Sequence, residues 1–289
     1  MHWGDIVKSK AGALGPLVLG IDPVITHAPR SLLVEPDDFL ERYTTTLLNG
    51  AEGKVGFVKF QSAYFEAFGS AGIVRLARCI AIARERGFAI IMDAKRGDIG
   101  STAEAYARAY LVPGGSDLEV DCLTINPFLG SETLEPFVDC AREYGKGLFV
   151  LVKTSNPGSG WLQDRNVSNK SVSRHVADRV ASWADETLGD HGIGAVGAVV
   201  GATYPVEGQQ LRVAMPRSIF LAPGLGVQGG DPAIISSLST QTGSVLISAS
   251  RGIAAIDDRD LPLEEYVALV RHRLDGFRSA LDIQTPIIC

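Results

Sequence analysis

The residues best suited to chemistry lie close together in the segment Asp93-Ala-Lys-Arg-Gly-Asp98. They follow the apolar residues 88–92, which are typical of a buried β-strand. Because strand side chains alternate between two faces, we expect Asp93 and Lys95 to point the same way, with Asp98 three residues further on. Charges at the mouth of an apolar core are costly unless paired, and a lysine between two carboxylates is favoured as its ammonium. The segment therefore predicts a fixed proton donor rather than a general base.

Polar side chains also end four other predicted strands. A single Asp or Lys at a strand end is more often a solvated residue or an ion-pair partner. Five strands that share the feature indicate a common site instead. The four further strands end in Asp22, in Lys59 and Gln61, in Lys153 and Ser155, and in Arg251.

A glycine-rich segment, residues 222–231, follows the seventh predicted strand. Its backbone N–H groups could approach an anion closely, and Arg251 on the next strand has a guanidinium suited to phosphate. A flexible loop in which Asp231 caps a helix that begins at Pro232 would explain part of the segment without a ligand. Both interpretations can hold, because a glycine-rich loop ahead of a helix can also act as a closing lid.

Other kinds of chemistry find less support in the sequence. None of the five histidines ends a predicted strand, no pair has metal-ligand spacing and there is no GxSxG motif, which disfavours metal-assisted hydrolysis and a serine triad. The four cysteines are scattered and indicate reduced thiols in a cytoplasmic protein. The histidines are His2, His27, His175, His191 and His272, and the cysteines are Cys79, Cys122, Cys140 and Cys289.

The elements that must position these residues are eight short apolar runs separated by stretches of helical periodicity. Eight strand–helix repeats without a long linker favour parallel strands, and the economical solution is an α/β fold, a single (β/α)8 TIM barrel over residues 1–289. A doubly wound sheet is weakened because Gly20-Ile-Asp-Pro-Val24 replaces GxGxxG after the first strand. The predicted strands are 17–22, 56–61, 88–95, 122–126, 148–155, 195–202, 219–223 and 245–251.

Composition narrows the range of partners. The 289 residues are 46% hydrophobic and 21% charged, and 27 basic against 33 acidic residues give a net charge of -6. Without a basic block, this balance argues against nucleic-acid binding, so an anionic ligand must be attracted by local cations. No apolar run approaches the roughly 18 residues of a membrane span. Residues 8–21 resemble a signal peptide only weakly, because Gly12, Gly15 and Pro16 interrupt them, and are interpreted as a loop and the first strand.

Together these segments resemble the orotidine 5'-phosphate decarboxylase family, in its longer bacterial branch, over nearly the whole chain. Residues 93–99 match the family signature Asp-x-Lys-x-x-Asp-Ile. The other matching segments, in the family's order, are Leu19-Gly-Ile-Asp-Pro23, Phe57-Val-Lys-Phe60, Lys153-Thr-Ser-Asn-Pro157, Pro223-Gly-Leu-Gly-Val-Gln228 and Ser250-Arg-Gly252.

The resemblance implies decarboxylation of orotidine 5'-monophosphate (OMP) to uridine 5'-monophosphate in pyrimidine biosynthesis, without a cofactor or metal, by a homodimer with shared active sites. Lys95 would donate the proton, and Asp93 would hold it and face the departing carboxylate. Asp98 would enter the site from the other subunit. The binding residues implied are Ile99 and Thr102, also from the other subunit, Asp22 and Lys59 for the ribose, Ser155 for the pyrimidine, Gln228 for base and phosphate, and Arg251 for the phosphate.

Some features depart from this pattern. Ser250 stands where the shorter branch has Gly, Asn126 has no assigned role, and residues 156–170, with Trp161, form a long connection that could be a second lid or a surface insertion. Related sugar-phosphate decarboxylases and aldolases, such as 3-keto-gulonate-phosphate decarboxylase and hexulose-phosphate synthase, share Asp-x-Lys-x-x-Asp but use Mg²⁺, for which Lys59 is an unsuitable ligand. A non-catalytic phosphate-binding barrel would not need Asp93, Lys95 and Asp98 together.

Overall fold

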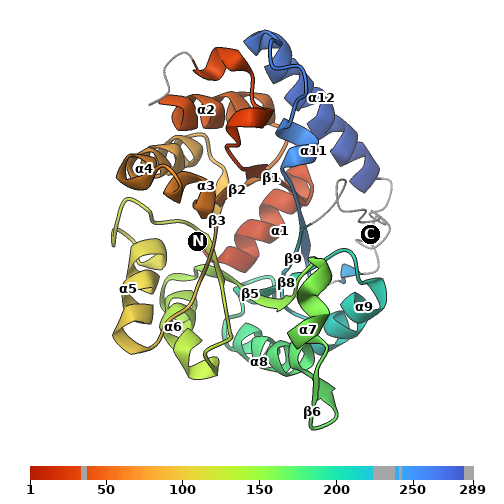
Figure 1. Ribbon diagram of the computed structural model, residues 1–289. Coiled ribbons are helices and arrows are strands. Elements are labelled where there is room, and N and C mark those ends of the chain that lie inside the picture. The colour runs from red at the N-terminus through yellow and green to blue at the C-terminus, as the bar shows by residue number, and fades with distance from the viewer. Residues whose placement is uncertain (34–37, 224–237, 241–242, 283–289) are drawn as a thin grey trace.

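The computed structural model describes residues 1–33, 38–223, 238–240 and 243–282. Eight parallel strands close into a barrel in the order β1-β10-β9-β8-β5-β4-β3-β2, with helices around it (Figure 1). The predicted (β/α)8 barrel is confirmed. Its strands are β1 Leu17–Ile21, β2 Phe57–Gln61, β3 Ala89–Arg96, β4 Cys122–Ile125, β5 Gly147–Lys153, β8 Val196–Val200, β9 Phe220–Pro223 and β10 Val245–Ala249.

The outer helices bury one apolar face each against these strands. In α2, Phe39, Tyr43 and Leu47 are buried at a spacing of four residues, which places them on one face of the helix. Gly50 of α2 lets Val270 of α12 come close, since a Cβ at Gly50 would lie 2.7 Å from Val270 Cγ1. The longer helices are α2 Phe39–Ala51, α4 Gly69–Glu85, α5 Gly100–Leu111, α6 Glu135–Tyr144, α8 Val172–Glu186, α9 Pro205–Ala214 and α12 Leu263–Asp282; the shorter ones include α3 Ser62–Glu66 and α11 Arg251–Ala254.

An N-terminal helix, α1 Trp3–Leu14, corrects the prediction that residues 8–16 form a loop. Gly12 interrupts the pattern in sequence but lies near the helix end, and the helix stops at Gly15, whose φ of 82° suits glycine. Trp3 is fully buried and makes edge contacts with Phe57 and Phe149, at 6.3 and 6.2 Å between ring centroids. The helix thus covers the amino-terminal opening of the barrel and is seen through the ring of strands in Figure 1.

The long connection after β5 forms a small substructure of its own. It contains the 3-10 helix η5 Pro157–Ser159, the helix α7 Gly160–Gln163, and a hairpin of β6 Asn166–Val167 and β7 Lys170–Ser171 that projects from the lower edge in Figure 1. We call residues 154–164 the strap. The expectation of an insertion at residues 156–170 is therefore met by the strap and the hairpin.

Two strands lose their regular register near their carboxyl ends. The β3–β4 ladder shifts between Met92 and Arg96, and the β5–β8 ladder shifts between Leu151 and Lys153. Such bulges redirect the side chains that follow them. Both lie at the end of the barrel where (β/α)8 enzymes build their active sites.

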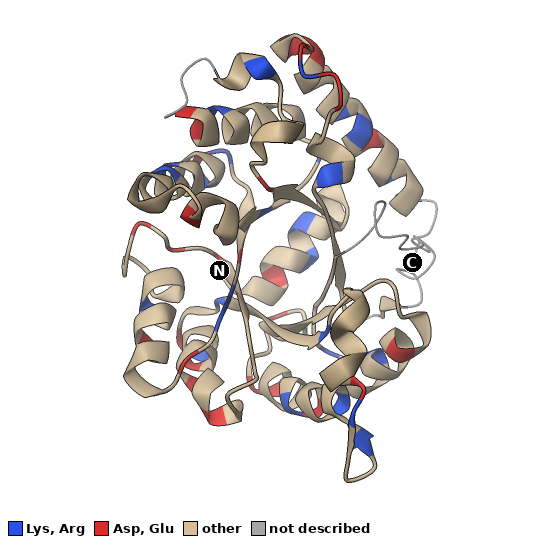
Figure 2. Cartoon of the chain, in the orientation of Figure 1, with Lys and Arg blue, Asp and Glu red and all other residues tan. Residues whose placement is uncertain are grey.

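The distribution of charged residues and the length of the apolar helices agree with what the composition predicts. Figure 2 shows basic and acidic residues mixed over the outer helices. No helix in the described ranges combines the length and the apolar character needed to cross a membrane. Three cysteines, Cys79, Cys122 and Cys140, are buried free thiols, and burial raises the pKa of Cys79 to about 12 and that of Cys140 to about 11. Cys289 lies outside the described residues.

Candidate active site

A cavity of about 970 Å³ opens at the carboxyl ends of the strands. It brings together most of the residues predicted from the strand ends, from five different strands or the loops that follow them. The predicted residues that line it are Asp22, Lys59, Gln61, Asp93, Lys95, Ser155 and Arg251.

A continuous charge network occupies the floor of this cavity beside β2 and β3. Lys95 Nζ lies 2.5 Å from Asp93 Oδ1, and Lys59 Nζ lies 2.9 Å from Asp93 Oδ2. Gln61 Nε2 donates a longer bond, 3.4 Å, to the same Oδ2. One carboxylate is therefore shared by two ammonium groups, a geometry in which both oxygens have charge-assisted partners.

The network fixes the charge of its buried members. Burial alone would raise the pKa of Asp93, but the nearby Lys59 and Lys95 outweigh it and hold that pKa well below its usual range. Burial would lower the pKa of Lys59, but Asp93 and Asp22 outweigh it and raise that pKa. Both groups are therefore ionised at neutral pH, so the floor of the site presents fixed charges.

Lys95 reaches this position through an unusual backbone conformation. Its φ is +48°, in the left-handed region that residues other than glycine rarely adopt. Its N–H donates to Thr124 Oγ1 at 2.9 Å, and this hydroxyl lies 3.1 Å from Asp93 Oδ1. Asp93 and Lys95 face the same cavity as predicted, but the bulge and a left-handed residue produce this arrangement rather than simple strand alternation.

Asp22 lies beside the network with an unused acceptor. Its Oδ1 is buried and has no hydrogen-bond partner among the described residues. A buried acceptor without a donor is unfavourable and indicates a place for a ligand hydroxyl or amine. The neighbouring Gly20 is required here, since a Cβ would lie 2.6 Å from Ser250 Cβ, so the serine that departs from the shorter branch packs directly against β1.

Arg251 and Ser155 line other walls of the cavity. Arg251 is an exposed residue that begins α11, and its side chain has no hydrogen bond or ion pair within the described ranges. Ser155 has room because Gly201 opposite it has no side chain; a Cβ there would lie 2.9 Å from Ser155. Gln228 and the glycine-rich residues 224–230 lie outside the described residues.

Three predicted site residues do not line this cavity: Asp98, Ile99 and Thr102. Asp98 Oδ1 accepts the N–H of the adjacent Ile99 at 2.8 Å, at the start of α5. Ile99 is 63% exposed, and Phe128, on the loop after β4, is 72% exposed. Asn126 holds that loop, because its Oδ1 accepts the Phe128 N–H at 3.0 Å.

Lys153 does not line the cavity, which corrects its grouping with the other strand-end charges. It is absent from the cavity lining, and its side chain is 1% exposed. Its Nζ pairs with Asp164 of the strap and lies 4.3 Å from the ring centroid of Tyr204. The register shift between Leu151 and Lys153 lies directly before this side chain and departs from simple strand alternation.

The strap forms one wall of the cavity and is attached at both ends. Gln163 is bound to Thr154 twice, through the Thr154 N–H at 2.9 Å and the Thr154 hydroxyl at 2.8 Å. Ser159 Oγ lies 3.2 Å from the Tyr204 hydroxyl. Trp161, on the cavity lining, is 77% exposed, whereas Trp3 and Trp183 are buried.

Sequence reasoning missed several other lining residues, including His27, Tyr64 and Thr124. His27 and Tyr64 lie in short helices after β1 and β2, where no periodic pattern marks them. Thr124 did carry a signal, since it is a polar residue inside the otherwise apolar strand β4 Cys122–Ile125.

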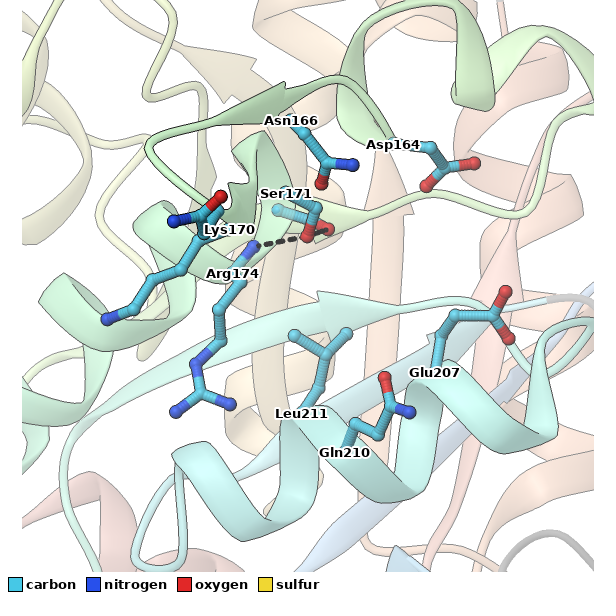
Figure 3. A pocket seen from close by; sticks show the side chains of 10 residues that line it. Asp164, Asn166, Lys170, Ser171, Arg174, Glu207, Gln210 and Leu211 are labelled. Carbon is cyan, nitrogen blue, oxygen red and sulfur yellow. Dashed lines mark hydrogen bonds between the residues drawn. The ribbon is translucent and has the colours of Figure 1, made fainter.

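A second cavity of about 520 Å³ lies between the β6–β7 hairpin, the start of α8 and α9 (Figure 3). Asp164 and Asn166 face Glu207 and Gln210 of α9 across it. Asp164 thus lines this cavity while it also pairs with Lys153.

The barrel and the site define the class of the protein: a (β/α)8-barrel enzyme with a buried lysine–aspartate network beneath a polar cavity. The chain belongs to the orotidine 5'-phosphate decarboxylase / HUMPS family, whose model matches residues 16–266. It is 41% identical to orotidine 5'-phosphate decarboxylase of Rhodopirellula baltica over 254 residues, 84% of each chain. It is 42% identical to the enzyme of that name from Deinococcus radiodurans over 240 residues, 82% of this chain and 85% of the relative.

Solved structures give the same result. A crystal structure from Streptomyces avermitilis, assigned to the same enzyme, superposes with a TM-score of 0.79 at 34% identity and covers 97% of this chain and 96% of that one. The Leishmania donovani OMP decarboxylase structure has a TM-score of 0.68 at 30% identity, with 95% of this chain and 99% of that one covered.

Proposed function

We propose that this chain decarboxylates OMP to uridine 5'-monophosphate in pyrimidine biosynthesis, without a metal or organic cofactor. The observation that carries the proposal is the Lys59–Asp93–Lys95 network on the floor of the cavity. The relatives support the proposal: two proteins that are about 40% identical to this chain over most of its length are both named orotidine 5'-phosphate decarboxylase.

The network suits a reaction that develops negative charge on carbon. When the bond between C6 of the pyrimidine and the carboxylate carbon breaks, CO2 leaves and the electron pair remains on C6. An ammonium fixed near C6 stabilises this charge as it forms, and interactions that strengthen in the transition state speed the step. Lys95 then transfers its Nζ proton to C6 and regains a proton from solvent. Asp93 holds Lys95 in place through the 2.5 Å contact.

The remaining lining residues have roles that fit their chemistry. Asp22, with its unpartnered buried oxygen, and Lys59 bind the ribose hydroxyls. Ser155 binds the pyrimidine. Arg251, whose side chain forms no ion pair within the described ranges, binds the phosphate through its planar guanidinium. Gln228 completes base and phosphate binding.

We also propose a homodimer in which Asp98, Ile99 and Thr102 enter the partner's cavity. All three lie outside the cavity of their own chain. The exposed Ile99, Phe128 and Leu129 at the ends of β3 and β4 form an apolar surface that a second copy would cover. The catalytic unit is then residues 1–289 of each chain, one barrel domain per subunit, and we place the enzyme in the cytoplasm.

The competing activity is that of a Mg²⁺-dependent sugar-phosphate decarboxylase or aldolase. That reaction needs a carboxylate on the second strand, where this chain has Lys59, bonded to Asp93 at 2.9 Å. The test is the fall in OMP absorbance after purified protein is added, with and without EDTA. Turnover that EDTA leaves unchanged supports the proposal. No turnover of OMP, or turnover abolished by EDTA and restored by Mg²⁺, would refute it.

A further inference from the structure

Thr124, on β4, occupies a special place opposite the irregular end of β3. Met92 pairs with Leu123 and Arg96 pairs with Ile125, so the three residues 93–95 of β3 face the single residue Thr124. The extra residues cannot all form ladder hydrogen bonds in such a bulge. The Thr124 hydroxyl replaces one lost bond by accepting the Lys95 N–H at 2.9 Å.

The same hydroxyl also contacts the carboxylate of the network. Thr124 Oγ1 lies 3.1 Å from Asp93 Oδ1, closer than the 3.5 Å to the alternative acceptor, Met92 O. Asp93 Oδ1 is also the atom that holds Lys95 Nζ. Because Thr124 is buried at 1% exposure, water does not readily replace its hydroxyl. One neutral group therefore connects the backbone of Lys95 to the carboxylate that binds the side chain of Lys95.

The backbone of Lys95 needs such a partner. A φ of +48° is unfavourable for a residue with a long side chain and persists only where surrounding contacts impose it. Relaxation of this residue toward an extended conformation would move the Cα–Cβ bond and hence the position of Nζ. Simple β-propensity would explain a Thr in a strand, but valine would serve that purpose equally well and would make neither bond.

We propose that Thr124 is a positioning residue for the decarboxylation: its hydroxyl holds the Lys95 backbone in the left-handed conformation and orients the Asp93 carboxylate toward Lys95 Nζ. The proposal rests on the proposed function of Lys95 as proton donor. Its consequence is that loss of the hydroxyl impairs the chemical step more than substrate binding, because Thr124 contacts Lys95 and Asp93 Oδ1, whereas the proposed ribose ligand Lys59 is held by Asp93 Oδ2.

The decisive comparison is between Thr124→Ser and Thr124→Ala, which both lack the methyl group and differ only in the hydroxyl. We expect Thr124→Ala to lower kcat by about 10- to 100-fold, the effect of a misplacement near 1 Å, while KM for OMP changes little. Thr124→Ser should retain most of the kcat. Thr124→Val, which keeps the shape, should resemble Thr124→Ala. Thr187→Val, a buried threonine whose hydroxyl bonds to Trp183 O on α8, is the control and should leave kcat unchanged.

Each outcome bears on a separate claim. Equal kcat for Thr124→Ser and Thr124→Ala, or an effect confined to KM, would overturn the positioning role. Circular dichroism and Tm verify the fold, and the Ser/Ala pair remains interpretable if Thr124→Val is unstable. Wild-type protein and Lys95→Ala are measured alongside: an inactive wild type refutes the proposed function, and an active Lys95→Ala refutes the proton donor, whereas failure of the Thr124 proposal alone leaves both intact.

Discussion

The carboxyl ends of β2, β3 and β4 differ in construction from the elements that line the rest of the cavity. At the strand ends, Lys59, Asp93 and Thr124 are buried and bonded to one another or to Lys95. The strap after β5 lies outside the barrel and exposes Trp161, and Arg251 is exposed without a partner in the described part. In the proposed mechanism, the groups that stabilise the transition state are held by the barrel, whereas the strap and the phosphate-binding Arg251 are left open to receive the substrate.

This contrast predicts a hierarchy of mutational effects. Changes in the buried network should reduce kcat, because the proposed mechanism places transition-state stabilisation there. Changes in the strap and at Arg251 should first affect substrate binding or overall stability.

The largest effect is expected for Lys95→Ala. Turnover of OMP should become undetectable because the variant lacks both the cation near C6 and the proton donor. Binding of the product should be largely retained, since phosphate and ribose contacts remain; isothermal titration with uridine 5'-monophosphate measures it. Normal turnover would show that Lys95 is not needed for the chemical step, and the functional contrast between the network and the binding elements would then fail.

Arg251→Ala should rank second, with kcat/KM lowered by several orders of magnitude and an intact fold. If Arg251 binds the phosphate as proposed, its guanidinium acts far from the reacting carbon, and its binding energy serves closure of the site and exclusion of water. Steady-state kinetics and circular dichroism test both parts. If kcat/KM were unchanged, Arg251 would not belong to the phosphate site.

The two regions also differ in how far the sequence predicts them. The barrel and the strand-end network were predictable, because strand periodicity and one signature place Asp93 and Lys95 together. The left-handed Lys95 and its bond to Thr124 were not, since a bulge depends on the register between two strands. Lys153 was misassigned for the same reason: the register shifts at the end of β5, and Lys153 pairs with Asp164 instead of lining the cavity.

The ion pair between Lys153 and Asp164 attaches the strap to the barrel, and its two side chains differ in exposure. Lys153 is 1% exposed and Asp164 is 50% exposed. Asp164→Asn leaves a buried charge without its partner and should lower the free energy of unfolding by about 1 to 3 kcal/mol, less than for a fully buried pair. Lys153→Met leaves only a partly solvated carboxylate and should cost less. Urea denaturation of both variants measures the difference, and an equal or reversed order would argue against this anchorage.

The smallest effect is expected for Trp161→Ala, because the exposed indole on the cavity lining has no partner to lose in the described part of the chain. Stability should be unchanged, and KM for OMP should rise only a few-fold at unchanged kcat, since one aromatic contact contributes about 1 kcal/mol. Trp161 also gives a direct readout: with Trp3 and Trp183 buried, a fluorescence change on product binding should disappear in Trp161→Phe. A loss in kcat comparable to that of the Thr124 variants would mean that the strap takes part in the chemical step, and the division between a rigid network and an open binding wall would fail.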